Sequence, residues 1–297
     1  MEDILNFKRI KDYNDFNNVE TLHPLVNVVN LENAHPRQYR RLRYEFYTIF
    51  LKKIKCGDLR YGLNTYDYEE GTLIFLAPGQ VIGENKEEYY QPQGIALVFH
   101  PDLIHGTTLG GKIGEYGFFS YAVNEALHLS EQERKIIMDC LGKIEYELKH
   151  AIDKHSKHLI VSNIEMFLDY CTRFYDRQFM TRDTVNHGIL ERFEDLLSGY
   201  FNSDKPFEKG LPNVTYCAEE LRLSANYFGD LIKKETGKSA QEYIQLKVID
   251  LAKERMFDPD KSISEIAYEL GFKYPQHFTR LFKQKTGTTP NVYRSLN

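Results

Sequence analysis

Residues 262–294 read SISEIAYELGFKYPQHFTRLFKQKTGTTPNVYR, and this stretch decides the fold of the carboxyl-terminal part of the chain. Its second half repeats an earlier pattern: Phe228-x2-Leu231-x-Lys233-x2-Thr236-Gly237-x5-Tyr243 recurs 50 positions later as Phe278-x2-Leu281-x-Lys283-x2-Thr286-Gly287-x5-Tyr293. Upstream, Ala218, Glu220 and Leu221 recur 49 positions later as Ala267, Glu269 and Leu270. The fixed spacing of these identities predicts two copies of one helix-turn-helix unit. Two such units in a row indicate a protein that contacts two adjacent groove segments of DNA.

The second unit begins with a capping box at Ser262-Ile-Ser-Glu265, in which the serine and glutamate side chains each bind a free backbone amide. Gly271 is predicted to make the turn. Pro275 suits the first turn of the following helix, where its missing N–H is not needed. The helical spacing places three apolar residues on the buried side: Phe278, Leu281 and Phe282. The outward face then consists of Gln276, Thr279, Arg280 and Lys283.

The outward residues of the second unit are of types that read bases. Arginine makes a paired contact to guanine, glutamine to adenine, and the threonine methyl group touches thymine. Lys283 lies farther along the helix and is expected to contact phosphate. The matching face of the first unit carries Asn226, Gly229, Asp230 and Lys233, a poorer set because glycine reaches nothing and phosphates repel Asp230. We therefore expect base discrimination to be concentrated in the second unit.

The charge of the chain is divided unevenly along its length. The 297 residues carry a net charge of -5, yet residues 211–297 hold 13 Lys and Arg against 11 Asp and Glu. Within residues 271–297 there are five basic residues and no acidic one. A locally basic end on an acidic chain suits contact with phosphates and limits indiscriminate binding.

The length and composition predict a cytoplasmic protein of two domains. The hydrophobic share is 42% and the charged share 27%, which are ordinary values for a globular protein. No apolar run approaches the ~20 residues that cross a bilayer, and the start of the chain lacks the core of a signal peptide. The four cysteines are scattered, without a C-x-x-C pair, which favours reduced thiols over a disulfide framework or a zinc site.

The first 125 residues are predicted to form strands. Four segments are rich in β-branched and aromatic residues and are separated by Gly and Pro: Tyr44–Ile54, Thr72–Leu76, Gly94–Phe99 and Gly117–Val123. Short strands with frequent turns suggest an antiparallel jelly roll, which can enclose a small ligand. The predicted fold class is therefore α+β, with a β jelly roll and helices followed by an all-α tandem helix-turn-helix domain.

The pattern changes to helical near Ser130, which opens a second capping box with Glu133. Three apolar stripes follow at helical spacing, and each must be buried against the chain's own barrel or in a dimer seam. The polar segment Asn202–Pro212 is predicted to be a loop. The expected organisation is a β sensor domain at 1–125, a helical dimerisation segment at 126–185, a linker helix and loop at 186–212, and a DNA-binding domain at 213–297.

The carboxyl-terminal motifs resemble those of the AraC/XylS family of bacterial transcription regulators. The resemblance rests on residues 262–272, Phe278-Thr-Arg-Leu-Phe-Lys283, Thr286-Gly287 and Tyr293-Arg294, and covers about 85 residues. It implies a seven-helix domain with both recognition helices in successive major grooves. It also implies a cupin-like sensor domain. The implied partners are promoter or operator DNA and RNA polymerase. Activation and repression of transcription are both compatible with the resemblance. The family's base-reading positions fall on Asn226, Gly229, Asp230, Pro275, Gln276, Thr279 and Arg280.

The front half offers a candidate ligand pocket and no candidate catalytic or metal site. None of the ten histidines forms an H-x-H pair, and no cofactor motif is present, so a non-enzymatic protein is expected. The expected pocket is lined by Tyr44, Phe46, Phe50, Tyr66, Phe99, His100 and His105. The alternatives are an ordinary filled core, and a DNA-binding regulator without a ligand whose first domain serves dimerisation or protein contact. The leading hypothesis is a homodimeric regulator controlled by a small molecule.

Overall fold

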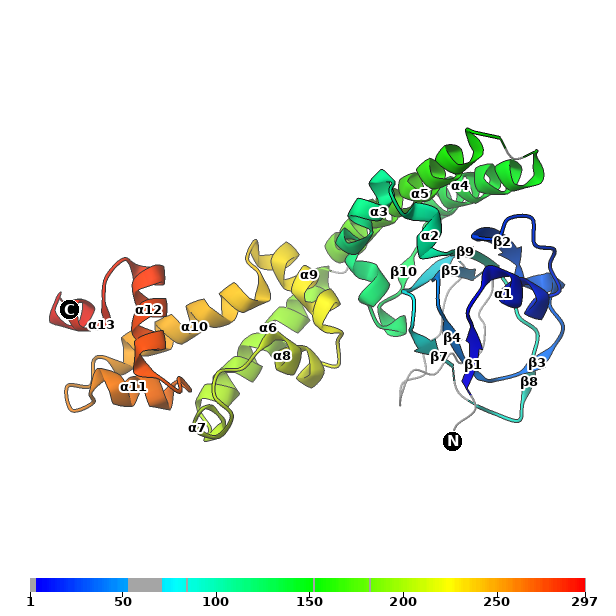
Figure 1. Cartoon of the computed structure of the whole chain (residues 1–297). Helices are drawn as coiled ribbons and strands as arrows, with labels where there is room; N and C mark the ends of the chain where they lie inside the picture. The colour runs from blue at the N-terminus through cyan, green and yellow to red at the C-terminus, as the bar shows by residue number, and fades with distance from the viewer. Residues whose placement is uncertain (1–3, 53–70, 84, 152, 182, 297) are drawn as a thin grey trace. The chain divides into compact units, whose positions relative to one another are not determined.

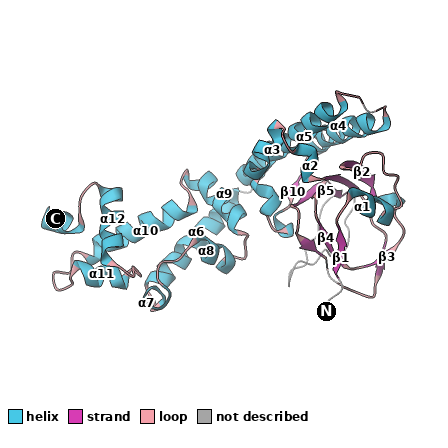
Figure 2. Cartoon of the chain, in the orientation of Figure 1, coloured by secondary structure: helices cyan, strands magenta, loops and turns pink. Residues whose placement is uncertain are grey.

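The computed structural model describes residues 4–52, 71–83, 85–151, 153–181 and 183–296, which form two compact units (Figure 1). The first unit comprises residues 1–181 and the second residues 182–297. Figure 2 shows the strands confined to the first unit, whereas the described part of the second is helical. None of the helices in the described ranges is long and apolar enough to cross a bilayer.

The first unit is built on a five-stranded antiparallel sheet in the order β10-β6-β5-β9-β2. Its strands are β2 (Val26–Asn30), β5 (Tyr47–Lys52), β6 (Thr72–Leu76), β9 (Ile95–Phe99) and β10 (Leu127–His128). Every residue of β6 is buried, as expected for a central apolar run bounded by turns. The structure confirms the strands predicted at Thr72–Leu76 and at 94–99.

A second sheet of three strands follows the order β1-β4-β7, and two further strands pair as β3-β8. These strands are β1 (Ile4–Phe7), β3 (Arg37–Gln38), β4 (Arg41–Tyr44), β7 (Val81–Ile82) and β8 (Tyr89–Tyr90). β1 pairs with β4 in parallel, so the expectation of purely antiparallel pairing is wrong for this sheet. The strand predicted over 44–54 is also divided, because Tyr44 ends β4 in one sheet and Tyr47 begins β5 in the other. Residues 53 and 54 lie outside the described residues.

The strand predicted at Gly117–Val123 is wrong, because residues Gly117–Ser120 form a turn of 3-10 helix. Backbone bonds from Phe119 to Tyr116 and from Tyr121 to Phe118, both 3.3 Å long, close the turn. A strand would send Phe118 and Phe119 to opposite faces. In the turn both rings are buried against Phe75, at centroid distances of 4.4 and 5.6 Å.

Short helices and one long helical pair complete the first unit. They are α1 (Ile10–Phe16), α2 (Pro101–Ile104), α3 (Thr108–Lys112), α4 (Glu131–Lys149) and α5 (Ser156–Thr181). The predicted capping box at the start of α4 is present: Ser130 N donates to Glu133 Oε2 over 2.8 Å, and Glu133 N donates to Ser130 Oγ over 3.3 Å. The apolar stripe of α5 is buried, and α5 packs on α4 and on β10. This stripe therefore packs against its own unit.

Aromatic rings fill the core of the first unit between α1 and both sheets. The ring of Tyr13 lies edge-on to those of Phe7, Tyr44 and Phe46, at centroid distances of 5.4, 5.7 and 6.0 Å. Edge-to-face contacts of this kind add to the free energy of apolar burial. The rings hold α1 against β1 and β4 and thereby build one wall of the cavity described below.

The second unit consists of α6 (Asp183–Phe201), α7 (Lys205–Lys209), α8 (Val214–Glu220), α9 (Ala225–Thr236), α10 (Ala240–Arg255), α11 (Ile263–Glu269), α12 (Pro275–Thr286) and α13 (Pro290–Leu296). The segment 202–212, predicted to be a loop, contains the short helix α7. The apolar stripe of α6 packs on the first helix-turn-helix unit, where the ring of Phe193 lies 4.9 Å from Phe228 and 5.4 Å from Tyr243. At Phe193 this stripe is therefore buried within the second unit.

Candidate nucleic-acid interface

The sequence repeat is also a repeat of backbone geometry. In the first helix-turn-helix unit, formed by α8 and α9, Leu223 N donates to Ala218 O over 2.9 Å. In the second helix-turn-helix unit, formed by α11 and α12, Phe272 N donates to Ala267 O over the same distance. The turn between α8 and α9 therefore has the same hydrogen bond as the turn between α11 and α12. The structure confirms the prediction of two helix-turn-helix units.

The second helix of each unit ends in the same way. Gly237 and Gly287 adopt left-handed backbone conformations, with φ of 71° and 82°, and each amide donates to the carbonyl four residues earlier over 2.9 Å. Thr236 and Thr286 donate their hydroxyls to the carbonyls of Ile232 and Phe282, over 2.7 and 2.8 Å. The repeated Thr-Gly pair is thus the stop signal of both helices.

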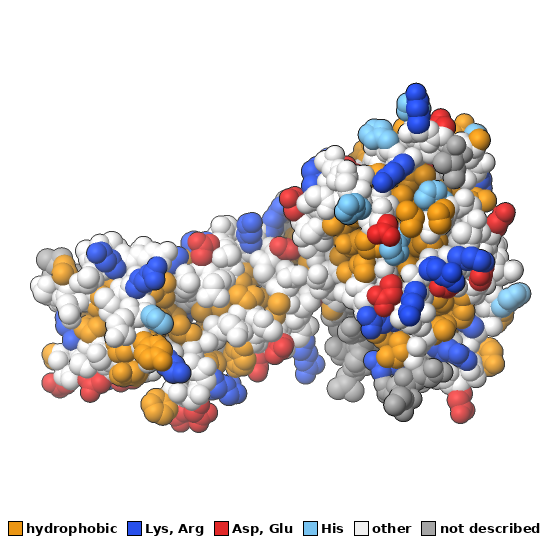
Figure 3. Space-filling view, in the orientation of Figure 1, with side chains coloured by type: hydrophobic (Ala, Val, Ile, Leu, Met, Phe, Trp, Pro, Cys, Tyr) orange, Lys and Arg blue, Asp and Glu red, His pale blue; other side chains and the backbone are white. Residues whose placement is uncertain are grey.

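The second helix of the second unit, α12, presents the predicted outward face. Phe278 and Phe282 are fully buried, whereas Gln276, Arg280 and Lys283 are exposed and Thr279 is half-buried. Leu281, predicted to be buried, is only half-buried because it lies at the edge of the apolar stripe. Figure 3 shows basic side chains and a histidine, beside exposed hydrophobic side chains, over the part of the molecule that α12 occupies in Figure 1.

The polar groups of α12 remain available to a ligand. In the described part of the chain, no ion pair joins Arg280 or Lys283 to an acidic residue. The hydroxyl of the half-buried Thr279 donates to Pro275 O over 3.1 Å, so this hydroxyl is already hydrogen-bonded within the helix. Pro275 occupies the first turn of the helix, as predicted. The outward face of α12 therefore carries two cations, an amide and a threonine.

The corresponding face of α9 is exposed but chemically poorer. Phe228, Leu231 and Ile232 are buried, so Asn226, Asp230 and Lys233 face outward. A Cβ added to Gly229 would meet nothing within 4 Å, so the helix surface is open there. One face of α9 thus offers one amide, one carboxylate and one cation.

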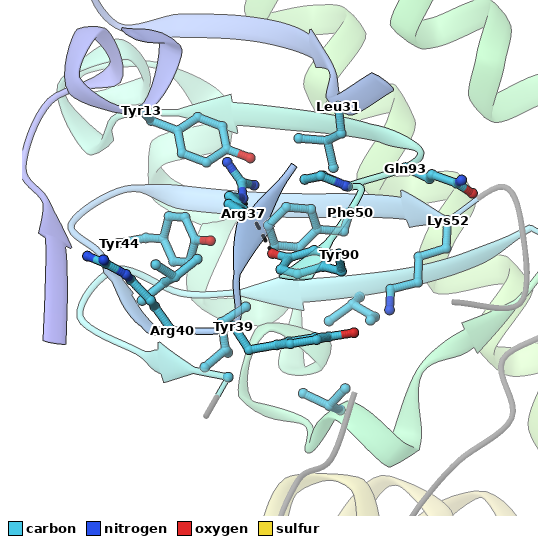
Figure 4. A pocket seen from close by; sticks show the side chains of 16 residues that line it. Tyr13, Leu31, Arg37, Tyr39, Arg40, Tyr44, Phe50, Lys52, Tyr90 and Gln93 are labelled. Atoms are coloured by element: carbon cyan, nitrogen blue, oxygen red, sulfur yellow. Dashed lines mark hydrogen bonds between the residues drawn. The ribbon is translucent and has the colours of Figure 1, made fainter. Parts of the chain in front are cut away.

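The residues predicted to line a ligand pocket are not all brought together. Tyr44 and Phe50 line a cavity of about 120 Å³ in the first unit (Figure 4). Phe46 is buried in the core nearby, and Phe99 stacks on Tyr47. His100 caps α2 by accepting from Asp102 N over 3.2 Å, and His105 is exposed at the end of that helix. Tyr66 lies outside the described residues.

Sequence reasoning missed the polar residues of this cavity. Tyr13, Arg37 and Tyr90 come from α1, β3 and β8, and they meet only because the three elements converge on the cavity. No local pattern marks them, since β3 and β8 are two residues long. The pairing of Arg37 with Tyr90 across these strands is the structural feature that brings them together.

The cysteines and other potential metal ligands do not form a reactive site where the structure describes them. Cys140, Cys171 and Cys217 are buried, and burial raises the pKa of each thiol, that of Cys217 to about 12. A thiol that stays protonated is a weak nucleophile and a poor metal ligand. No group of three or more His, Cys, Asp or Glu suited to a metal ion occurs in the described ranges.

Comparison with known proteins agrees with the geometry of the second unit. Residues 217–295 match the model of a helix-turn-helix domain family. They form a helix-turn-helix domain. This domain begins within α8 and ends within α13, so it contains both copies of the repeat.

Two regulators resemble the chain over parts of its length. YfiF of Bacillus subtilis, an uncharacterized HTH-type transcriptional regulator, is 32% identical over 153 residues, which are 50% of this chain and 45% of YfiF. YijO of Escherichia coli, also an uncharacterized HTH-type transcriptional regulator, is 24% identical over 227 residues, which are 76% of each chain. The chain thus spans less than half the length of YfiF.

Among solved structures, the C-terminal domain of AraT, a response regulator from Geobacillus stearothermophilus, covers 37% of this chain and 85% of its own. Its sequence is 26% identical, and the TM-score is 0.33.

Proposed function

We propose that this protein is a sequence-specific DNA-binding regulator of transcription. The observation that carries the proposal is the duplicated helix-turn-helix in which both second helices, α9 and α12, keep a polar face exposed. A helix of this kind fits the major groove, and two in tandem fit successive turns of one duplex. Double-stranded operator DNA is therefore the proposed partner.

The two helices are proposed to contribute unequally to sequence recognition. Gln276, Thr279 and Arg280 on α12 supply groups that distinguish bases, and Lys283 supplies a phosphate contact. On α9, Asn226 is the main candidate for a base contact, Lys233 meets phosphate, and Asp230 accepts only from a cytosine amine. Specificity in this proposal comes mainly from the groove segment that receives α12.

The first unit is proposed to act as a sensor. Its cavity has a volume of about 120 Å³, roughly ten times the ~10–15 Å³ that one water molecule needs, which leaves room for a small ligand. This favours a ligand-controlled regulator over one whose first unit serves only dimerisation. A ligand that binds one conformation of this unit better than another shifts the population toward it.

A homodimer and contact with RNA polymerase complete the proposal. On α4 and α5, Tyr146 and Leu159 line one shallow surface and are 60% and 41% exposed. Apolar side chains exposed together mark surfaces that associate with other proteins. A two-fold seam along these helices is the proposed dimer contact.

Selection of binding sites from random double-stranded DNA by the purified full chain tests this function. We expect an enriched motif with two blocks about one helical turn apart, the better defined block being the one that faces α12. The matched control is the double variant Gln276→Ala/Arg280→Ala, which should lose the sharper block and keep general affinity. Enrichment of no motif, or the same motif for both proteins, would refute the proposal.

A further inference from the structure

The charge of the cavity lining in the first unit selects the sign of its ligand. Three cationic side chains line it, Arg37, Arg40 and Lys52, and no Asp or Glu does so among the described residues. Opposite charges attract strongly in a partly enclosed site, where the effective dielectric constant is low. The lining therefore favours an anion over a cation or a neutral polyol.

Arg37 is held in place by neutral groups. Its Nε donates to the hydroxyl of Tyr90 over 3.4 Å, and its Nη1 donates to Asn17 Oδ1 over 3.0 Å. Its guanidinium carbon also lies 4.2 Å from the ring centroid of Phe16. In the described ranges no carboxylate pairs with Arg37, so its guanidinium is held in place while its positive charge is not compensated by a negative one. Such a group is ready to bind an anion with two parallel hydrogen bonds.

A second donor lies beside Arg37. The side chain of Tyr13 is only 1% exposed, and its hydroxyl has no hydrogen-bond partner in the described structure. A buried polar group without a partner costs free energy, so a ligand that accepts from it recovers that cost. Tyrosine hydroxyls are protonated at neutral pH, and burial raises the pKa of Tyr13 and of Tyr44 further, so both can donate. Figure 4 shows the Tyr13 hydroxyl and the Arg37 guanidinium turned toward the same part of the cavity.

Much of the remaining wall is apolar, although Tyr39, Arg40, Lys52 and Gln93 also contribute polar ends. The apolar part includes Leu31, Leu42, Phe50, Ile74, Ile82 and Val123. These side chains offer no partner to the hydroxyl groups of a sugar, and burying such hydroxyls without partners is unfavourable. These walls favour a ligand that carries an apolar body beside its polar end.

We infer that this cavity binds a small monocarboxylate with an apolar body, whose carboxylate is held by Arg37 and Tyr13. The two oxygens of a carboxylate match the planar fork of a guanidinium, and the Tyr13 hydroxyl supplies a further donor. Such a ligand would be the effector of the proposed regulator, and only this regulatory role depends on the proposed function. Binding itself is a property of the first unit.

Titration calorimetry and thermal unfolding of the full chain test the inference with matched pairs of probes. Phenylacetate and hexanoate are compared with the neutral phenylacetamide and hexanamide, which keep the shape and remove the charge. We expect the acids to bind and to raise the unfolding temperature, and the amides to bind at least about tenfold more weakly. Equal binding of acids and amides, or binding of neither, overturns the inference.

Three variants assign the carboxylate contact. Arg37→Gln should weaken phenylacetate binding about tenfold or more and abolish the preference for acids over amides. Tyr13→Phe removes a hydroxyl that has no partner in the protein, so it should fold normally and lose a few-fold in affinity for the acid. Lys11→Gln, an exposed cation of α1 paired with Asp15, is the control and should bind like the parent. Unchanged affinity in both Arg37→Gln and Tyr13→Phe overturns the assignment.

The DNA selection described above separates the two proposals. A chain that selects a DNA motif but binds none of the acids loses the effector class and keeps its function as a regulator. A chain that binds the acids through Arg37 but selects no DNA keeps the carboxylate site and loses the proposed function.

Discussion

At the scale of single residues, the proposed reading of DNA by α12 depends on exposed side chains that form no ion pair within the described part of the chain. Arg280 and Lys283 are both exposed cations on one helix, yet they lie at different positions along it. A contact to a base edge carries sequence information, whereas a contact to phosphate does not. The two residues should therefore fail in different ways when they are removed.

Replacing Arg280 by Ala should weaken binding to the selected operator by about 1–3 kcal/mol and relax specificity at one base pair. Replacing Lys283 by Ala should weaken binding to all sequences alike and reduce the slope of log affinity against log salt by about one. Fluorescence anisotropy over a salt series, with operators changed at each position, measures both effects. A uniform loss with Arg280→Ala would place that residue on phosphate instead.

Gly271 lies in the turn of the second helix-turn-helix unit, at the position that Arg222 occupies in the first helix-turn-helix unit. Both residues have left-handed backbones, with φ of 91° and 61°. A Cβ at Gly271 would also lie 2.7 Å from the carbonyl carbon of Gly210, whereas a Cβ at Gly237 would meet nothing within 4 Å. The close approach between two backbones is what requires glycine at 271.

Gly271→Ala should lower the free energy of unfolding of the second unit by more than about 2 kcal/mol, because backbone strain and a backbone clash add. Gly237→Ala is the matched control, with φ of 71° and open space, and should cost only about 1 kcal/mol. Urea denaturation followed by circular dichroism compares the two variants. Equal losses would show that the contact with Gly210 relaxes at little cost.

At the scale of elements, α6 stabilises the first helix-turn-helix unit from outside the repeat. The ring of Phe193 is fully buried and meets Phe228, which belongs to the repeated motif. The apolar stripe of α6 could be predicted from its spacing, but its partner could not, because periodicity shows that a face is buried and not against what. The segment 117–123 failed for a related reason, since consecutive aromatic residues suit a strand and a tight turn equally well.

Phe193→Ala should lower the free energy of unfolding of the second unit by about 3–5 kcal/mol, because it leaves a large cavity between α6 and α9. Arg192→Ala, a neighbouring exposed residue on the same helix, should change it by less than about 0.5 kcal/mol. Calorimetry of the full chain measures both. A small loss with Phe193→Ala would mean that α6 is dispensable for the fold of the repeat.

At the scale of the whole molecule, the chain joins a unit with a partly enclosed cavity to a unit in which two helices expose polar faces. If a ligand of the first unit alters the affinity of the second for DNA, thermodynamic linkage requires the reverse effect of equal size. The coupling needs only a differential affinity between two states of the chain.

We expect phenylacetate to change operator affinity about 5–150-fold, the usual range of coupling between two sites, and operator DNA to change phenylacetate affinity by the same factor. Calorimetric titrations of each ligand in the presence and absence of the other measure the two factors. Arg37→Gln should require about tenfold more phenylacetate, or more, to produce the same change in operator affinity, because it weakens binding of the acid. Two factors that differ beyond error would contradict a single coupled equilibrium.

The sequence by itself determined the tandem helix-turn-helix, because each unit is defined by contacts a few residues apart that leave a repeated pattern of apolar residues, caps and Thr-Gly stops. It also determined which face of α12 points outward, since that follows from helical spacing. Only the tertiary structure decided the partner of α6, the parallel pairing of β1 with β4, and the meeting of Tyr13, Arg37 and Tyr90 at one cavity. Those contacts join residues distant along the chain, and local periodicity contains no information about which distant segment will lie opposite.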